Sequence, residues 1–552
     1  MLCLKQKPIL KHLRVLSFSG QAIRKLPDFL GELIHLRYLD LSHTLIGELP
    51  SSICSLYNLQ TLLLSSCYNL TVLPENIGDL INLRRLDASE TNLAEMPVAF
   101  GRLKSLRVLT NFVVSKDSGS RINELGKLSH LRSTLTISKL EFVVNAIDAS
   151  KADLKSKNYL NELVFQWNSD THEVQTETKV LDNLRPHENM KKLTIENYGG
   201  ARFPNWLCDA IFANLVFLHL SRCKKCMALP PLGQLSSLQE LRISKMERLQ
   251  NLDAGFYGNS HMGVKPFRCL KTLWFEDLPN WVHWIPSTNE GEEFPSLQEL
   301  QIQGCPELIG SLPKHLGSLT KLVVSGCRKL KASIPRVPTL KEMKLHCLDA
   351  LTTLPEELLG GNSCFQQLEI VNCPSLISFF GGDSLTTLKS ISISYCRKLE
   401  FFQPENVMHQ FGVLERLHIS NSCESLESLP LGIFTKLQYL HIKDCENLKS
   451  LSTQDMVLTF LQEIKIKDCL ELESLPGGGL HTCLPCLLRL ELSNCPKLSQ
   501  FSQGNLPLNL QSLIISNCNN LTPQKEWGLH GMVSLTCFEI EGGCSNVKFF
   551  PE

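Results

Sequence analysis

The stretch Leu36-Arg37-Tyr38-Leu39-Asp40-Leu41 decides the fold of this chain. Its pattern, L-x-x-L-x-L, returns 23 residues later as Leu59-Gln60-Thr61-Leu62-Leu63-Leu64. From Leu13 to Leu535 the pattern occurs in about 22 units, some of them degenerate, with a mean period of about 25 residues. A fixed period of this length indicates a repeat architecture, in which each unit buries its apolar edge only against its neighbours.

Each unit is expected to form one coil of a leucine-rich-repeat solenoid. The L-x-L segment predicts a short strand whose alternate side chains point inward, and successive strands stack into a parallel sheet. The remaining leucines fill the interior from the turn and from the outer side. The sequence therefore predicts an α/β fold. It is a horseshoe-shaped solenoid with one long parallel concave β-sheet and a mostly irregular convex side, not the several globular domains that 552 residues suggest.

The composition excludes several classes of protein. The 55 Lys and Arg balance 55 Asp and Glu, so net charge gives no case for a dedicated nucleic-acid or anionic-membrane binder. With 43% hydrophobic and 20% charged residues, the chain does not have the composition of a disordered protein. No apolar run approaches the ~18 residues of a membrane span. Because Lys5 and Lys7 stand where a secretory signal is apolar, we expect a cytoplasmic protein.

Cysteines recur at one position of the repeat, three residues after the last apolar residue of the strand. They are Cys67, Cys223, Cys305, Cys327, Cys373, Cys396, Cys445, Cys469, Cys495 and Cys518, with Cys423 and Cys544 one position later. A small inward side chain at this position can donate to backbone carbonyls. We expect a structural ladder of reduced thiols, because Thr44 and Thr91 occupy the same position in early coils. The pairs Cys223-Cys226 and Cys483-Cys486 lack partners at finger spacing, so no metal site is expected.

Three regions differ in regularity. Residues 1–110 form a regular N-terminal block of tight repeats, and residues 190–552 form a C-terminal repeat block. Between them, residues 111–189 are irregular, because the leucine spacing fails there. This middle segment contains a predicted short helix over 145–157 and a polar insertion from Ser169 to Lys179.

Whole phrases of the sequence resemble one family. The phrases include Leu33-Ile34-His35-Leu36-Arg37-Tyr38-Leu39-Asp40-Leu41-Ser42, Gly199-Gly200-Ala201-Arg202-Phe203-Pro204-Asn205-Trp206-Leu207 and Leu229-Pro230-Pro231-Leu232-Gly233-Gln234-Leu235. They resemble the repeat region of plant coiled-coil nucleotide-binding leucine-rich-repeat (CC-NB-LRR, or NLR) disease-resistance proteins, over nearly the entire chain. This resemblance implies a recognition module of an intracellular immune receptor that binds a pathogen effector or a modified host protein. It also implies that the first repeats restrain the nucleotide-binding (NB-ARC) domain in intact relatives.

The chemistry of a nucleotide switch is missing from this sequence. A phosphate loop needs G-x-x-x-x-G-K-[ST], whereas the pair Gly126-Lys127 is followed by Leu128 and lacks the glycine spacing. The pairs His172-Glu173 and His187-Glu188 lack the H-E-x-x-H frame of a zinc protease. We therefore expect no enzyme activity and no cofactor, the family's ADP/ATP site being absent. The NB-ARC domain is expected as a partner if this chain is part of a longer one.

Candidate binding residues follow from the alternation along each strand. Residues between the inward leucines project into solvent, so this face is expected to bind protein. Aromatic residues beside arginine dominate protein interfaces. The candidates on this face are Phe217, His219, Arg242, Trp274, His418, Tyr439 and His441. An alternative stays open for Trp274, which could merely cover its neighbours on a solvated sheet.

A basic group near the end of the first block is a second candidate surface. It consists of Arg84, Arg85, Arg102, Lys104 and Arg107. It is interpreted either as a contact with the nucleotide-binding domain or as an ordinary solvated face.

Two other functions compete with the immune-receptor interpretation. An F-box-type substrate adaptor of a ubiquitin ligase also favours cysteine at the ladder position. It is disfavoured because Leu-Pro follows that position here and no adaptor-binding helices precede Leu13. An extracellular receptor would need a signal peptide, capping cysteine pairs and G-x-I-P coils, and none of these is recognised in the sequence. One formal glycosylation sequon, Asn69-Leu70-Thr71, is present.

Overall fold

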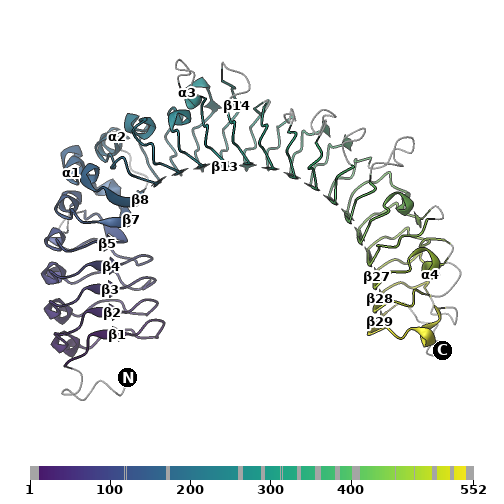
Figure 1. The fold of residues 1–552 in the computed structure, drawn as a ribbon, viewed down its shortest axis with the longest axis horizontal. Helices are drawn as coiled ribbons and strands as arrows, with labels where there is room; N and C mark the ends of the chain where they lie inside the picture. Colours follow the sequence, from purple (N-terminus) through teal and green to yellow (C-terminus); the bar gives the residue numbers. More distant parts are fainter. Residues whose placement is uncertain are drawn as a thin grey trace. The chain divides into compact units, whose positions relative to one another are not determined.

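A computed structural model gives the fold of the chain. It describes residues 11–116, 119, 121–168, 174–258, 265–287, 293–310, 312–313, 315–331, 337–354, 362–379, 386–400, 411–453, 456–477, 479–499, 501, 506–521 and 527–542. Two compact units are present, the first formed by Met1–Asn280 and Ile285–Asn289 and the second by Trp281–Trp284 and Glu290–Glu552. In each unit successive coils contribute strands to a parallel sheet (Figure 1), which confirms the predicted leucine-rich-repeat solenoid.

The first unit begins with five strands that pair in parallel in chain order. They are β1 (Val15–Ser17), β2 (Tyr38–Asp40), β3 (Thr61–Leu63), β4 (Arg85–Asp87) and β5 (Val108–Leu109). The next strands are β6 (Asn111–Val113), β7 (Arg132–Ser138), β8 (Tyr159–Gln166), β9 (Lys192–Glu196), β10 (Phe217–Ser221), β11 (Glu240–Ser244), the short β12 (Asn251–Leu252) and β13 (Thr272–Glu276). The register aligns Leu39 with Leu62 and Leu62 with Leu86, so equivalent residues of successive coils are neighbours.

The strand of one coil is split at Thr110, between β5 and β6. In the preceding coil the N–H of Leu64 donates to the carbonyl of Asp87 at 2.7 Å. At the corresponding place the N–H of Ala88 donates to the Thr110 hydroxyl at 2.9 Å, while the Thr110 carbonyl accepts from Thr136 at 2.9 Å. A side chain therefore continues the hydrogen-bond ladder at the point where the backbone passes from one sheet to the next.

Short helical segments complete the coils of the first unit, across from the strands (Figure 1). The α-helices are α1 (Ala146–Lys151), α2 (Val174–Asn183) and α3 (Ala254–Tyr257). The 3-10 turns are Asp28–Glu32, Ser51–Ser55, Glu75–Asp79, Phe100–Arg102, Ile122–Lys127, Leu140–Phe142, Leu154–Ser156, Asn205–Cys208 and Leu232–Gln234. The helix predicted over 145–157 is thus α1 followed by a 3-10 turn, and the Asn145 side chain caps α1 by accepting from the N–H of Ile147 at 2.9 Å.

The polar insertion differs from the prediction, because its second half belongs to helix α2. Residues 169–173 of the insertion lie outside the described residues. The buried carboxylate of Glu177 accepts from the backbone N–H of Gly199 at 2.6 Å. The indole of Trp206 donates to the Leu181 carbonyl at 3.0 Å. Contacts with the following coil therefore fix a helix where the sequence shows mainly polar residues.

The second unit continues the pattern of one strand per coil. Its sheet strands are β15 (Glu299–Gln303), β16 (Lys321–Ser325), β17 (Glu342–His346), β19 (Gln367–Val371), β21 (Ser390–Ser394), β22 (Arg416–Ser420), β24 (Tyr439–Lys443), β26 (Glu463–Lys467), β27 (Arg489–Ser493), β28 (Ser512–Ser516) and β29 (Cys537–Glu541). The other elements are β14 (His283–Trp284), β18 (Thr353–Leu354), β20 (Ser378–Phe379), β23 (Ser428–Pro430), β25 (Ser450–Ser452), α4 (Leu480–Cys483) and the 3-10 turns Leu431–Ile433 and Leu529–Gly531.

The core consists of the leucines of the repeat. Leu36, Leu39 and Leu41 of the deciding stretch are completely buried, as are Leu59, Leu62 and Leu64 of the next coil. Most strands in both units alternate buried and half-buried residues, as in β10 and β17. Burial of one leucine side chain stabilises the fold by roughly 1.5–3 kcal/mol, so every coil depends on its neighbours to cover its apolar edges.

A residue with positive φ follows each strand in most coils. Arg222 (φ 54°) and Lys245 (φ 56°) are examples in the first unit. The N–H of Arg222 donates to the Ser244 carbonyl at 2.9 Å, and the N–H of Lys245 donates to the Glu276 carbonyl at 2.8 Å. This left-handed conformation is uncommon for residues with a side chain. It is stabilised here by a hydrogen bond that joins each coil to the next.

Candidate functional site

The first candidate surface is the sheet face of strands β10, β11 and β13, meaning the side chains that alternate with the buried leucines. The parallel register places His219 beside Arg242 and Arg242 beside Trp274. Phe217 lies on β10, two residues before His219, and points to the same side. The structure therefore brings together the four residues Phe217, His219, Arg242 and Trp274, which we call the aromatic-arginine patch.

Arg242 lies at the centre of the aromatic-arginine patch. Its guanidinium carbon is 4.4 Å from the ring centroid of Trp274 and 5.9 Å from that of Phe217. Both distances are within the range of cation–π contact. The Nε of Arg242 donates to Oε1 of Glu240 at 2.6 Å. Two aromatic rings and one carboxylate therefore hold this side chain in one conformation.

His219 is tied to the neighbouring strand. Its Nε2 lies 3.2 Å from the hydroxyl of Ser244, and its ring packs edge-on against Phe217 at 6.5 Å between centroids. Burial lowers the pKa of His219, the charge of Arg242 lowers it further, and Glu240 acts in the opposite direction. At neutral pH the imidazole is therefore uncharged, and Arg242 is the cation of the patch.

Trp274 is half-buried on the sheet face. Its indole Nε1 is buried and has no hydrogen-bond partner among the described residues. An indole N–H usually finds an acceptor when it is buried. The interaction of Trp274 on this face is through the π-surface of its ring, which Arg242 contacts.

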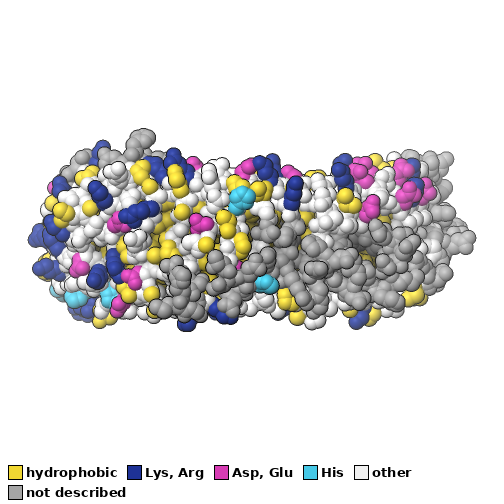
Figure 2. Space-filling view, turned by 90° about the horizontal axis from the view of Figure 1, so that it is seen from above, with side chains coloured by type: hydrophobic (Ala, Val, Ile, Leu, Met, Phe, Trp, Pro, Cys, Tyr) yellow, Lys and Arg dark blue, Asp and Glu magenta, His cyan; other side chains and the backbone are white. Residues whose placement is uncertain are grey.

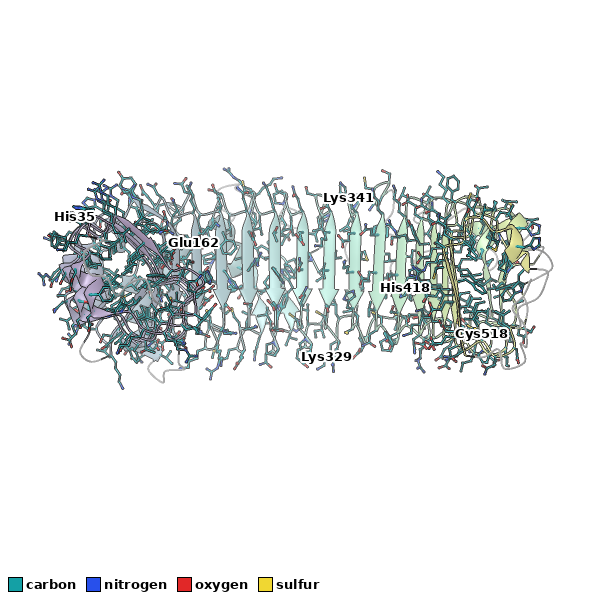
Figure 3. All side chains as sticks on the ribbon, turned by 90° about the horizontal axis from the view of Figure 1, so that it is seen from below. His35, Glu162, Lys329, Lys341, His418 and Cys518 are labelled. Carbon is teal, nitrogen blue, oxygen red and sulfur yellow. The ribbon has the colours of Figure 1, made fainter. Side chains whose placement is uncertain are left out.

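The other three candidates on the sheet face lie in the second unit. His418 lies on β22 (Figure 3). It is aligned in register with His441 on β24, and the two ring centroids are 6.1 Å apart. Burial and the proximity of His441 lower the pKa of His418. Tyr439 is stacked under Arg416, whose guanidinium carbon is 5.4 Å from the ring centroid.

A network of opposite charges crosses the sheet face of the second unit. Lys344 contacts both Glu342 at 3.1 Å and Glu369 at 3.2 Å. Glu463 contacts Lys465 at 2.7 Å and His441 at 2.9 Å. Burial raises the pKa of Glu463, but the hydrogen bonds from Lys465 and His441 outweigh burial and hold this pKa below its usual value. We call this network the charge ladder.

Further pairs extend the charge ladder. Glu491 contacts Lys467 at 2.5 Å and Arg489 at 3.3 Å, and Lys321 contacts Glu299 at 2.8 Å. Acidic and basic side chains are also present on the face that is seen from above in Figure 2.

The second candidate surface, the basic group, is only partly brought together. Arg107 donates its backbone N–H to the Arg84 carbonyl at 2.8 Å, so these two residues are neighbours at the edge where the strands begin. Arg85 lies on β4 and is paired with Asp87 at 3.4 Å, and Arg102 is paired with Asp79 at 3.0 Å. Lys104 is exposed near the end of a 3-10 turn.

Sequence reasoning missed two residues at the same edge, Arg14 and Arg37. A chain of backbone hydrogen bonds links Arg14, Arg37, Gln60, Arg84 and Arg107 in successive coils, each at 2.8 Å. The four arginines are exposed, and none of them has an ion-pair partner among the described residues. We call them the arginine column. The signal was visible in the sequence, because Arg stands directly before the strand in four of the first five coils.

Exposed apolar side chains accompany the arginine column. Ile34, Tyr57 and Ile81 each precede the column position by three residues, and they are 38%, 49% and 55% exposed. The amides of Asn58 and Asn82 donate to the carbonyls of Ile34 and Tyr57 at 2.8 and 2.7 Å, which aligns these positions from coil to coil. The edge therefore presents cations and apolar groups together, a combination typical of protein interfaces.

The described ladder cysteines are all buried thiols, and none of them forms a disulfide bond. Nine of them place Sγ near the carbonyl two residues earlier, for example 3.3 Å for Cys396 and 3.4 Å for Cys469. Cys67 instead donates to the Leu41 carbonyl of the preceding coil at 3.0 Å. Burial raises the pKa of Cys223 to about 12, which keeps this thiol protonated. Cys544 lies outside the described residues.

The described residues contain no group of three or more His, Cys, Asp or Glu side chains arranged to hold a metal ion. They also contain no helix of sufficient length and hydropathy to cross a membrane.

Comparison with family models identifies three matching regions. Residues 122–246 match the R13L1/DRL21 leucine-rich repeats. Residues 204–328 match the leucine-rich repeats of RPS2-like plant disease resistance proteins. Residues 35–56 match the general leucine-rich repeat.

Several curated proteins are similar to this chain. A disease resistance protein of Arabidopsis thaliana is 32% identical over 98% of this chain and 53% of its own length. A disease resistance RPP13-like protein of the same plant is 40% identical over 74% of this chain and 40% of its own length. Disease resistance protein RGA2 of Solanum bulbocastanum is 40% identical over 63% of this chain and 36% of its own length. The chain thus spans about half of these relatives or less, and the matches confirm the resemblance predicted from the sequence.

Proposed function

We propose that this chain, whose repeats belong to the leucine-rich-repeat families of plant disease-resistance proteins, is the protein-recognition module of an intracellular immune receptor. In this proposal it is non-catalytic and binds a pathogen effector or a modified host protein through its sheet face. The aromatic-arginine patch is the observation that carries the proposal. Trp and Arg are among the residue types that contribute most binding energy at protein interfaces, and Phe is also enriched there.

The proposal assigns a second role to the arginine column. The four arginines lack partners among the described residues and lie beside exposed apolar groups. Such an edge suits an acidic protein surface, and we assign it to the nucleotide-binding domain that the longer relatives suggest. In this proposal, nucleotide binding takes place outside this chain. The receptor is located in the cytoplasm.

The recognition role is tested by screening the full chain against a library of pathogen effectors in a two-hybrid assay. Partners that bind the wild-type chain are retested with Trp274→Ala and Arg242→Glu, with Arg416→Glu as the matched control on another part of the sheet face. Truncating a central Trp or reversing a central Arg is expected to weaken binding by roughly 2 kcal/mol or more, about 30-fold. Circular dichroism checks that each variant is folded. If every partner tolerates both changes at the patch, recognition does not use it.

The contact with the nucleotide-binding domain is tested separately. The nucleotide-binding domain of a CC-NB-LRR protein is expressed alone, and its binding to the chain is measured by calorimetry at two salt concentrations. The double variant Arg84→Glu and Arg107→Glu is expected to lose binding, since reversed charges repel an acidic partner. Trp274→Ala serves as the control that keeps it. Equal binding by the double variant contradicts this role of the column.

A further inference from the structure

Arg242 retains hydrogen-bonding capacity that the chain does not use. A guanidinium carries five N–H donors. Among the described residues only Nε is engaged, with Glu240 at 2.6 Å. The four N–H groups on the two Nη atoms have no hydrogen-bond partner there, and the side chain is 40% exposed. The end of the guanidinium is therefore open to a ligand.

The surroundings of Arg242 hold this open end in place. The ring of Trp274 on one neighbouring strand and the ring of Phe217 on the other lie 4.4 and 5.9 Å from the guanidinium carbon. Together with the bond from Nε to Glu240 they restrict its rotation. Because an arginine that is already fixed loses little conformational freedom on binding, its remaining donors are pre-organised for a planar acceptor.

The local charge selects the kind of anion. Glu240 neutralises much of the charge of Arg242, and His219 is held in its neutral form by burial and by Arg242. A dianionic phosphate would meet the nearby Glu240 carboxylate with little net positive charge to offset the repulsion. A single carboxylate needs only two parallel N–H···O bonds, which the two Nη groups can supply.

From this geometry we infer that Arg242 is a carboxylate-binding site, in which both Nη groups hold the side chain of an Asp or Glu on the protein partner. The inference deepens the proposed function, since it names the chemistry of the partner residue that docks on the aromatic-arginine patch. Arg416 provides the internal contrast. It is exposed, contacts one ring at 5.4 Å and has no carboxylate fixing its Nε.

The test uses fluorine NMR on the full chain labelled with 5-fluorotryptophan. The signal of Trp274 is assigned by its loss in Trp274→Phe. Sodium acetate is titrated against sodium chloride at constant ionic strength, and sodium phosphate is titrated in parallel. Acetate is expected to shift the Trp274 signal saturably, with phosphate binding more weakly. Arg242→Lys keeps the charge but loses the planar fork, so acetate is expected to bind it at least about tenfold more weakly. Arg416→Gln leaves the titration unchanged.

The outcomes separate this site from the proposed function. A saturable shift that survives in Arg242→Gln, no shift at all, or phosphate binding as tightly as acetate would overturn the carboxylate assignment. The effector screen is independent of this titration. If effectors depend on Trp274 while acetate does not bind, recognition stands and the carboxylate site falls. If acetate binds and no effector depends on the patch, the site stands and the proposed recognition role falls.

Discussion

The arginine column of the first unit and the charge ladder of the second unit use the same residue types differently. In the ladder, Lys344 lies between Glu342 and Glu369, and Glu463 lies between Lys465 and His441. In the column, Arg14, Arg37, Arg84 and Arg107 stand in four of the first five coils with no ion-pair partner among the described residues. Repeat position alone does not decide this, because Lys389 and Glu415 also stand directly before their strands and are paired at 3.4 Å. A charge is paired where the neighbouring coil carries the opposite charge at a matching position.

The difference shows which charges can interact with a binding partner. Residues on the sheet face stand opposite neighbours of the next strand, and opposite charges there stabilise the pairing of strands. The residues of the arginine column have their backbone bonded from coil to coil, while their side chains are exposed to water. Unpaired exposed charges steer and bind charged partners, whereas paired ones add little external potential. The total charge of zero therefore conceals one edge with a strong local sign.

The largest expected effect on the free energy of unfolding comes from Lys157, a buried lysine that has no ion pair among the described residues. It adds a buried case to the comparison of paired and unpaired charges. Lys157 is buried, and its Nζ donates to the carbonyls of Leu125 and Leu128 at 2.9 and 3.0 Å. Burial lowers its pKa from 10.5 to about 8, while Asp153 acts in the opposite direction. Between these two values the unfolded chain binds more protons than the folded one, so the free energy of unfolding rises with pH. The rise amounts to about 3 kcal/mol for this group.

Urea unfolding of the wild-type chain at pH 7.5 and pH 10 measures this rise. Lys157→Met is the control, because it removes this titration and keeps the other groups that ionise in the same range. The difference between the two chains isolates Lys157. A wild-type curve that changes with pH no more than that of the variant contradicts the prediction.

Breaking the charge ladder is expected to have a smaller effect. Lys344→Met leaves Glu342 and Glu369 facing each other. In the intact chain, the hydrogen bonds that Lys344 donates to these carboxylates raise the pKa of Lys344. Because the side chains are about a third exposed, solvent screening limits the loss to about 0.5–1 kcal/mol. Thermal unfolding at low and high salt gives the measurement. The loss should shrink at high salt, and a salt-independent loss would point to packing instead.

Removing charge from the arginine column is expected to change stability least. Arg84→Ala and Arg107→Ala together should stay within about 0.5 kcal/mol of the wild type, since no ion pair is lost. The same double variant should elute earlier from a cation exchanger, because it loses two cations of one local group. Lys344→Met, which also loses a cation but from a paired site, is the matched control. Equal elution shifts per charge in the two variants would erase the distinction between column and ladder.

Much of the fold was predictable because leucine periodicity is a direct consequence of coil packing. The strands fall on the L-x-L segments, and the ladder cysteines are buried after them. Helix α2 was missed because its buried side includes Glu177, a residue that the hydrophobic pattern counts as exposed. Its burial depends on a hydrogen bond to Gly199, 22 residues away, which no local pattern reveals.

The residues of the candidate site could be predicted from the sequence, whereas most of their geometry could not. Alternation along the strands identifies His219, Arg242 and Trp274, and equal repeat positions imply that they are neighbours. The pairing of Arg242 with Glu240 and its contact with two rings depend on side-chain conformation, which the sequence does not contain. Of the arginine column, Arg84 and Arg107 were predicted as part of the basic group, whereas Arg14 and Arg37 were missed. All four occupy the second position of the L-x-x-L-x-L motif, directly before the strand.

The positive-φ residue after each strand makes the coils interchangeable. Arg222 donates to the coil of Ser244, and Lys245 makes the same bond to the coil of Glu276. If one whole coil is excised, the flanking coils meet with the same donors and acceptors. Recombination between repeats can therefore shorten or lengthen such a gene without unfolding its product. An event that removes or inserts a coil beside β11 gives Arg242 a different neighbour, so new surfaces arise by shuffling coils as well as by point mutation.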